Sequence, residues 1–313
     1  MARRISPYSG KETRPSVVML LDVLGFGQMI EDTSKNKTEA GLLRRLLKAL
    51  GEAKPHLSDK IAFMSPKQQK EKLWDSKLFT DNVVVGIPIF QEGEGDLGIA
   101  LQTAGLYQYA LAQHGFFIRG AIAVGELFMN SDVVFGSGLI RAYKFEREFA
   151  RNPRVVIAPS ALELIQRHLC HYGEIRSAPH DYYLLVDTDG QLFVNYLMAP
   201  LAGAKPNKTY RTEVRNHKNK VEESLALYRN NPRIWSKYAW IANYHNFVAN
   251  WLLRGKKAYV VGNRCLEARP KRLREVYEKR GADLSRTDTG ELIRWMSGIE
   301  LAKSIKTGQA SFS

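Results

Sequence analysis

An uninterrupted apolar run, Val17 to Leu21, ends directly at an acidic residue, Asp22, and Gly25 and Gly27 follow three and five residues later. A continuous apolar run bounded by a glycine turn is typical of a strand that is buried on both faces. The run is far shorter than the roughly 20 residues that a membrane-spanning helix needs. The sequence therefore predicts a buried strand that ends at Asp22.

The patterns up to residue 200 mix helix and strand. Leucines at helical spacing predict a helix over residues 38–50, and the Thr-Asp-Asn segment around Asp81 predicts a hairpin within residues 77–88. The expected order then continues with a helix over 96–114, strands over 116–128 and 133–135, a helix over 138–151, a strand over 154–158, a helix capped by Ser160 and ending at Leu169, and a hairpin centred on Asp187–Gly190. This order lacks repeated strand–helix–strand units, so it predicts an α+β fold with helices over a mostly antiparallel sheet.

After Pro200 the chain becomes basic, and helical periodicity recurs over residues 214–229 and 233–253. The second helix carries aromatic residues from Trp235 to Trp251, a stripe that favours core or dimer packing, and His245 within it is expected to be a hydrogen-bonded core residue. We expect four segments: a flexible basic arm (1–15), a catalytic domain (16–200), a basic helical extension packed on that domain or on a dimer partner (201–264), and a polar tail (265–313).

The charge balance favours anionic partners. The 313 residues include 46 Lys and Arg against 32 Asp and Glu, a formal net charge of +14. Such a surplus suits nucleic acid, an anionic membrane face or nucleoside triphosphates, and it also serves solubility. Two cysteines are too few for a disulfide framework, and the charged start lacks the apolar core of a secretory signal. We expect a cytoplasmic protein that does not enter the membrane.

Two aspartates are the candidate metal ligands. Asp22 ends the apolar run and Asp81 lies in the hairpin turn, so both carboxylates meet at one sheet edge if the run and the hairpin are neighbours. Carboxylate oxygens are the ligands that Mg²⁺ and Mn²⁺ prefer, and two such ions can activate an attacking oxygen and stabilise a leaving phosphate. The alternative is ordinary capping and turn chemistry at both positions.

Three segments resemble the class III nucleotidyl cyclase homology domain: VVMLLDVLGFG (17–27), KLFTDNVVVG (77–86) and FIRGAIAVGELFMNSDVVFGSGLIRAYKFE (117–146). Together with the VDTDG–FVNYL hairpin and the late KYAWIANYHN helix, they are most similar to the pyrimidine cyclases of the Pycsar antiphage defence system. The resemblance covers roughly residues 16–255 and implies a ferredoxin-like catalytic domain with a helical C-terminal extension.

The resemblance also implies roles for individual residues. Asp22, Asp81 and the carbonyl of Val23 become ligands of two Mg²⁺ or Mn²⁺ ions, and Gly25 and Phe26 become part of the substrate site. Arg141 becomes the residue that stabilises the transition state, and Lys144 takes its place if the register slips by three residues. Ser137 replaces the family's asparagine four residues before that arginine.

Base recognition is assigned by the resemblance to Lys77 and Asp132. A Lys–Asp pair can read an exocyclic amine and a ring acceptor, which cytosine and adenine both offer, while the similarity of the longer segments favours a pyrimidine. The alternative is a surface ion pair. Arg119 is expected to pair with Glu126 or with another acid across the sheet rather than to hold phosphate, and the basic stretch 205–237 is expected to be a solvated face.

The implied activity is conversion of CTP or UTP to the 3′,5′-cyclic monophosphate and pyrophosphate. The family assembles as a head-to-tail homodimer, so the metal ligands come from one subunit and Arg141 from the other. The product is expected to activate a separate effector in antiphage defence. The alternatives are an adenylate cyclase and a catalytically inactive module that binds nucleotide or nucleic acid.

Overall fold

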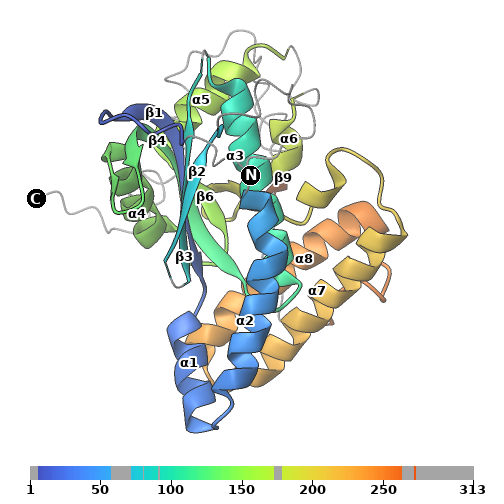
Figure 1. Cartoon of the computed structure of the whole chain (residues 1–313). Helices are drawn as coiled ribbons and strands as arrows, with labels where there is room; N and C mark the ends of the chain where they lie inside the picture. Colours follow the sequence, from blue (N-terminus) through green and yellow to red (C-terminus); the bar gives the residue numbers. More distant parts are fainter. Residues whose placement is uncertain are drawn as a thin grey trace, which may run out of the picture.

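Strand β1 (Arg14–Val23) lies between β3 (Asn82–Pro88) and β4 (Ile118–Met129) and is antiparallel to both (Figure 1). This computed structural model describes residues 6–57, 72–79, 81–90, 92–172, 178–262 and 271–272. Strand β2 (Asp75–Phe79) pairs with the outer edge of β3. The register places Asp22 opposite Asn82 on one side and Arg119 on the other. The predicted buried strand and the predicted hairpin are therefore neighbours in one sheet.

The sheet continues beyond β4 in the order β6, β8, β7, β9. Strand β6 (Val155–Ile157) runs parallel to β4, whereas the other pairs within the described sheet are antiparallel. The remaining strands are β5 (Val134–Phe135, paired with β4), β7 (Leu184–Val186), β8 (Leu192–Val194) and β9 (Lys271–Arg272). The expected α+β class with a mostly antiparallel sheet is confirmed.

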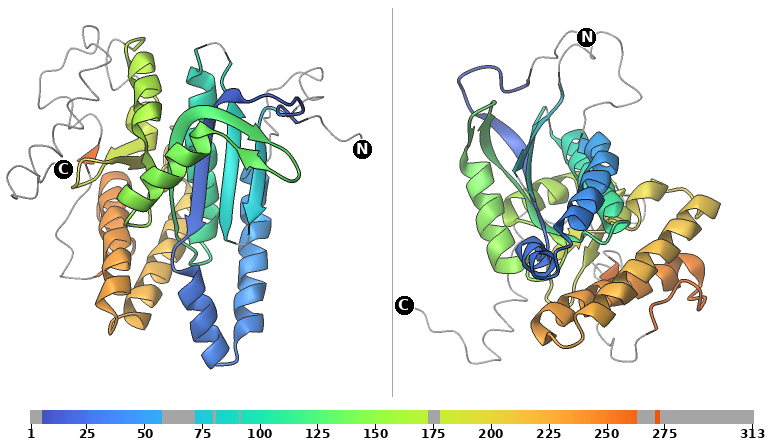
Figure 2. Two further views of the ribbon diagram at one scale, coloured as in Figure 1. Left: turned by 90° about the vertical axis from the view of Figure 1, so that its left-hand side faces the viewer. Right: turned by 60° about the horizontal axis from the view of Figure 1, so that its bottom comes forward.

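Helices fill the connections and cover both faces of the sheet (Figures 1 and 2). Helices α1 (Phe26–Lys35) and α2 (Glu39–Ala53) connect β1 to β2, and α3 (Glu94–Ala112) connects β3 to β4. The later helices are α4 (Ser137–Phe149), α5 (Pro159–Leu169), α6 (His180–Tyr183), α7 (Lys208–Leu227) and α8 (Pro232–Leu253), with short 3₁₀ turns at Lys54–Leu57 and Ala199–Leu201. No described helix is both long and apolar enough to cross a bilayer.

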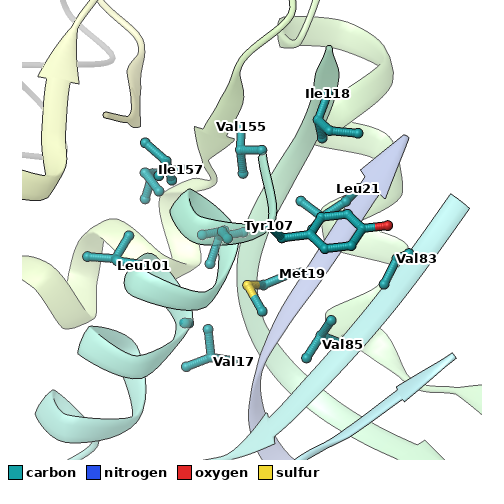
Figure 3. Close-up of a cluster of buried hydrophobic side chains, with 14 of the residues drawn as sticks. Val17, Met19, Leu21, Val83, Val85, Leu101, Tyr107, Ile118, Val155 and Ile157 are labelled. Atoms are coloured by element: carbon teal, nitrogen blue, oxygen red, sulfur yellow. The ribbon is translucent and has the colours of Figure 1, made fainter. Parts of the chain in front are cut away.

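The larger apolar cluster lies between the sheet and α3 (Figure 3). Alternate residues of β1, namely Val17, Met19 and Leu21, point to this side and are fully buried. Leu101 and Tyr107 of α3 complete this part of the cluster. Because side chains alternate along a strand, Val18, Leu20 and Asp22 are left on the opposite face.

That opposite face is covered by α4 at very short range. An added Cβ on Gly125 of β4 would lie 2.7 Å from the backbone nitrogen of Gly138 in α4, and one on Gly138 would lie 2.6 Å from Val18 Cγ2. The two glycines let the helix rest directly on β4 and β1, which fixes the height of α4 above Asp22.

Helices α7 and α8 share a core with the sheet. Tyr238 of α8 makes an edge-to-face contact with Phe117, with ring centroids 5.7 Å apart, and Phe193 of β8 packs against Trp240 and Tyr244. The aromatic stripe therefore serves core packing, as expected, and the region assigned to an extension is part of the folded body.

Several details differ from the expectations. Ser160 does not cap α5: Ala158 is the capping residue and Pro159, whose ring fixes a helical φ, occupies the first turn, while the Ser160 hydroxyl accepts the Val124 N–H at 3.0 Å. Helix α7 begins earlier than predicted because the Asn207 side chain caps it at Tyr210 N.

The ends of the chain also differ in part. In the expected arm, Tyr8 is buried and its hydroxyl lies 2.9 Å from Ser16 Oγ. In the expected tail, Lys271–Arg272 pair with β7. The polar stretch 58–72, for which the sequence predicts a loop or a short helix, lies almost wholly outside the described residues.

We predict that Gly125→Ala lowers the free energy of unfolding by about 1–3 kcal/mol, the usual cost of overpacking, because its Cβ would meet the α4 backbone. Gly51→Ala is the matched control: apart from its own helix backbone, no atom of the described part of the chain lies within 4 Å of its Cβ position, and alanine favours a helix. Thermal unfolding of the two variants should show a lower Tm for the first alone. An unchanged Tm for Gly125→Ala would contradict the close α4 contact.

A buried chain of hydrogen bonds joins α7 to α8. His245 Nε2 donates to the Tyr259 carbonyl at 2.6 Å, so its Nδ1 accepts from His217 Nδ1 at 2.9 Å. His217 Nε2 in turn accepts from the Tyr196 hydroxyl at 2.8 Å. Every contact is satisfied with both imidazoles neutral. Burial lowers the pKa of His245 to about 4 and lowers the pKa of His217 well below its usual value.

This pair predicts loss of stability in acid. Below about pH 6.5 the two histidines bind protons in the unfolded chain but stay neutral in the folded one. The free energy of unfolding that the pair contributes is therefore complete above about pH 7 and falls as the pH drops toward 4. At pH 5 the expected loss is on the order of 2 kcal/mol per histidine. Urea unfolding at several pH values measures it, and His245→Gln should flatten the dependence. Equal pH dependence in both proteins would contradict this account.

Candidate functional site

A cavity of about 610 Å³ opens where β1 ends, beside the β2–β3 turn, the start of α1 and the middle of α4. Its volume lies within the range usual for small-molecule sites. Residues from six elements and two turns line it: Leu20, Asp22, Val23, Gly25, Phe26, Gly27, Phe79, Asp81, Asn82, Val84, Arg119, Tyr143, Glu146 and Arg147.

The two candidate metal ligands meet in this cavity. Asp22 is the last β1 residue on the face covered by α4, and its side chain is 14% exposed. Asp81 precedes β3 in the turn, 59 positions later along the chain. Burial raises the pKa of Asp22, Arg119 opposes this shift, and the neighbouring Asp81 carboxylate raises the pKa further. The structure thus brings the two carboxylates together as predicted.

Arg119 provides the positive charge beside this pair. Its Nε donates to Asp22 Oδ2 at 2.7 Å and lies 3.1 Å from Glu146 Oε1. The sequence predicts that Arg119 pairs with Glu126 or with another acid across the sheet, and Asp22 on the neighbouring strand is that other acid. Burial raises the pKa of Glu146, an effect that Arg119 opposes and that Asp22 strengthens.

The chain turns sharply after Val23 and starts a helix that points at the cavity. Gly25 has a φ of 68° and precedes the first residue of α1, a left-handed conformation that glycine adopts at little cost. Apart from the local backbone, no atom of the described residues lies within 4 Å of a Cβ on Gly25 or Gly27. The unpaired N–H groups of this first turn, together with the helix dipole, suit an anionic group.

Three residues of α4 line the cavity although the sequence does not indicate them. Tyr143, Glu146 and Arg147 share one face of the helix at three- and four-residue spacing. The Arg147 guanidinium lies over the Tyr143 ring, 5.6 Å from its centroid. The spacing was visible in the sequence, but nothing in it indicated which helix face meets Asp22.

Lys237 of α8 is a fourth residue that the sequence did not indicate. Burial lowers the pKa of its ammonium, Arg119 and Arg233 lower it further, and Asp22 opposes them. These influences place Lys237 within electrostatic reach of the cavity, and the packing of its neighbour Tyr238 on Phe117 holds that end of α8 beside β4.

The two candidate base-reading residues are brought together outside the cavity lining. Lys77 Nζ donates to the Ser131 carbonyl, one residue before Asp132. Asp132 lies in a turn in which Asn130 Oδ1 accepts the Asp132 and Val133 N–H groups at 2.9 and 2.8 Å. The described contacts of Lys77 therefore include this turn, but they do not include an ion pair with the Asp132 carboxylate.

The candidate transition-state residue is not part of the cavity of its own chain. Arg141 is exposed, and its Nη1 donates to the Val124 carbonyl at 2.9 Å. Lys144 is also exposed on α4, and the Ser137 hydroxyl accepts the Glu126 N–H at 3.1 Å. Neither Arg141 nor Lys144 lines the cavity with Asp22 and Asp81.

The oxygen donors at the end of β1 and in the β2–β3 turn fit a hard divalent cation whose remaining ligands come from a substrate. Among the described residues no group of three or more His, Cys, Asp or Glu side chains is arranged as a metal cage. Mg²⁺ is usually bound by one or two carboxylates together with substrate phosphates, and Asp22, Asp81 and the neighbouring Val23 backbone offer that partial set.

Comparisons with known proteins add no assignment. No protein-family model matches the chain, and no curated protein matches it significantly.

Proposed function

We propose that the chain is a nucleotide cyclase that converts CTP or UTP to the 3′,5′-cyclic monophosphate and pyrophosphate. The observation that carries the proposal is the meeting of Asp22 and Asp81, far apart in sequence, in a cavity of about 610 Å³. The helix start at Gly25 and the cation Arg119 border the same cavity. A pair of carboxylates beside groups that suit anions is what a metal–triphosphate substrate requires.

The connectivity supports a ferredoxin-like cyclase domain. Strands β1 to β4 lie in the order β2-β3-β1-β4, and adjacent strands are antiparallel. Helices join β1 to β2 and β3 to β4, while β2 and β3 form a hairpin. This β-α-β-β-α-β arrangement is the ferredoxin-like one, and it is the arrangement that the resemblance to class III cyclases implies.

The reaction forms one bond and breaks one. The ribose 3′-oxygen attacks the α-phosphorus, the bond from that phosphorus to the bridging oxygen of pyrophosphate breaks, and the 3′-hydroxyl proton passes to solvent. Two Mg²⁺ or Mn²⁺ ions would supply Lewis-acid activation and charge neutralisation. Asp22, Asp81 and the Val23 carbonyl would hold those ions, while Gly25, Phe26 and the first turn of α1 would position the triphosphate.

A second copy of the chain completes the site. Large apolar side chains are exposed around the cavity and along α4: Phe79 (51%), Phe135 (65%), Ile140 (52%) and Tyr143 (47%). An exposed apolar surface of this kind favours a protein interface. In a head-to-tail homodimer, Arg141 of one subunit stabilises the charge that develops at the other subunit's site.

Lys77 and Asp132 select the base. The contact between Lys77 and Ser131 holds the ammonium beside the turn that carries Asp132. A carboxylate there accepts from an exocyclic amine, a group that cytosine and adenine carry and uracil lacks. This arrangement favours CTP over UTP and makes adenylate cyclase the second candidate. The product acts in the cytoplasm as a messenger for a separate antiphage effector.

We predict that incubation with the four nucleoside triphosphates and Mn²⁺ yields a cyclic pyrimidine nucleotide, detected by chromatography and mass spectrometry. Asp22→Asn should reduce the rate by at least about a hundredfold, because it removes charge at the metal–phosphate centre. Glu223→Gln, at an exposed position of α7, is the control and should retain the rate. Absence of product from all four nucleotides would favour an inactive binding module.

A mixture of Asp22→Ala and Arg141→Ala proteins tests the shared site. Each protein alone should be inactive, and random subunit exchange should restore up to about a quarter of the sites, because half of the dimers are mixed and each contains one intact site. Activity of mixtures with confirmed subunit exchange is the measurement. Lack of recovery would place Arg141 in the site of its own chain or outside the chemistry.

A further inference from the structure

One guanidinium nitrogen faces two carboxylates from different elements. Arg119 Nε carries a single hydrogen, which it donates to Asp22 Oδ2 at 2.7 Å. Glu146 Oε1 lies 3.1 Å from the same nitrogen, yet it has no hydrogen-bond partner among the described residues. The Glu146 side chain is only 5% exposed. Glu146 Oε1 is therefore an acceptor that lies beside the Arg119 N–H while that N–H is hydrogen-bonded to Asp22.

Burying the Glu146 carboxylate in this way costs folding free energy, which a residue with a packing role alone would not require. A buried carboxylate oxygen without a hydrogen bond loses its hydration, and the ion pair with Arg119 is the compensation that the structure shows for Glu146 Oε1. The neighbouring Ala142, one turn earlier on α4, contacts the sheet as a small apolar side chain. Packing alone therefore does not require an acid at position 146.

A cation at Asp22 changes which carboxylate Arg119 prefers. The Asp22 oxygen that accepts from Arg119 cannot also face a divalent ion without bringing two positive charges within a few ångströms of each other, which is strongly repulsive in a half-buried site. Glu146 Oε1 is the closest alternative acceptor for the same N–H.

We propose that Glu146 is a positioning residue that takes Arg119 from Asp22 when a divalent cation binds the Asp22–Asp81 pair. This inference rests on the proposed function for the identity of the cation site. Without cation, Arg119 neutralises Asp22 and competes with the metal. With cation, the Arg119–Glu146 pair keeps the guanidinium at the cavity wall.

Binding of Mn²⁺ alone to the full-length chain, followed by electron paramagnetic resonance of the free ion, tests the proposal in a double-mutant cycle. Arg119→Met should tighten Mn²⁺ binding about tenfold or more, because it removes the competing cation. Glu146→Gln should weaken binding about tenfold in the wild-type background and by less than about threefold in the Arg119→Met background. Glu148→Gln, an exposed change on the same helix, controls for loss of charge and should have little effect.

Two results would overturn the proposal. The first is an equal effect of Glu146→Gln on Mn²⁺ affinity in both backgrounds, which would mean that Glu146 acts on the metal directly. The second is no effect of Glu146→Gln on Mn²⁺ affinity in the wild-type background. Circular dichroism verifies folding, and Arg119→Gln replaces Arg119→Met if the latter is unfolded. Cyclic nucleotide formation by the same proteins separates the two proposals. Product with an uncoupled cycle rejects only the role of Glu146, whereas a coupled cycle without product from any nucleotide rejects only the cyclase.

Discussion

The antiparallel pairing of β1 with both β3 and β4 is the constraint on which the rest of the molecule depends. Its register sets Asp22 level with Asn82 and Arg119, so the carboxylate at the end of β1 meets the β2–β3 turn on one side and a cation on the other. A slip of one residue would turn Asp22 toward the apolar cluster under α3. The same register thus serves the core and the cavity.

The cavity lining carries both acidic and basic side chains. Asp22, Asp81 and Glu146 face Arg119 and Arg147, and Lys237 lies within electrostatic reach. Burial shifts the pKa of Asp22 and Glu146 upward and the pKa of Lys237 downward, in each case because the charged form loses water. A site with this balance is suited to a ligand that combines a divalent cation with phosphate groups.

The C-terminal helices contribute more than surface charge. The aromatic stripe of α8 packs on Phe117, which directly precedes β4, and on β8, and the His217–His245 contact joins it to α7. This packing holds the start of α8, which carries Lys237, near Arg119 and Asp22. The basic stretch 205–237 therefore includes one side chain, Lys237, whose pKa is influenced by the charges of Arg119 and Asp22.

The sequence by itself determined most of the elements, though not α1, and the two aspartates, because apolar periodicity and turn residues are local signals: the run Val17–Leu21, the Asp81 turn and the long strand ending near Phe128 are all present. It could not identify Tyr143, Glu146, Arg147 or Lys237, since the face that a helix presents depends on how it docks. Gly125 against Gly138 set that docking for α4. Only the tertiary structure decided that Arg119 pairs with Asp22 and lies beside Glu146, because such contacts join residues from strands and helices far apart along the chain.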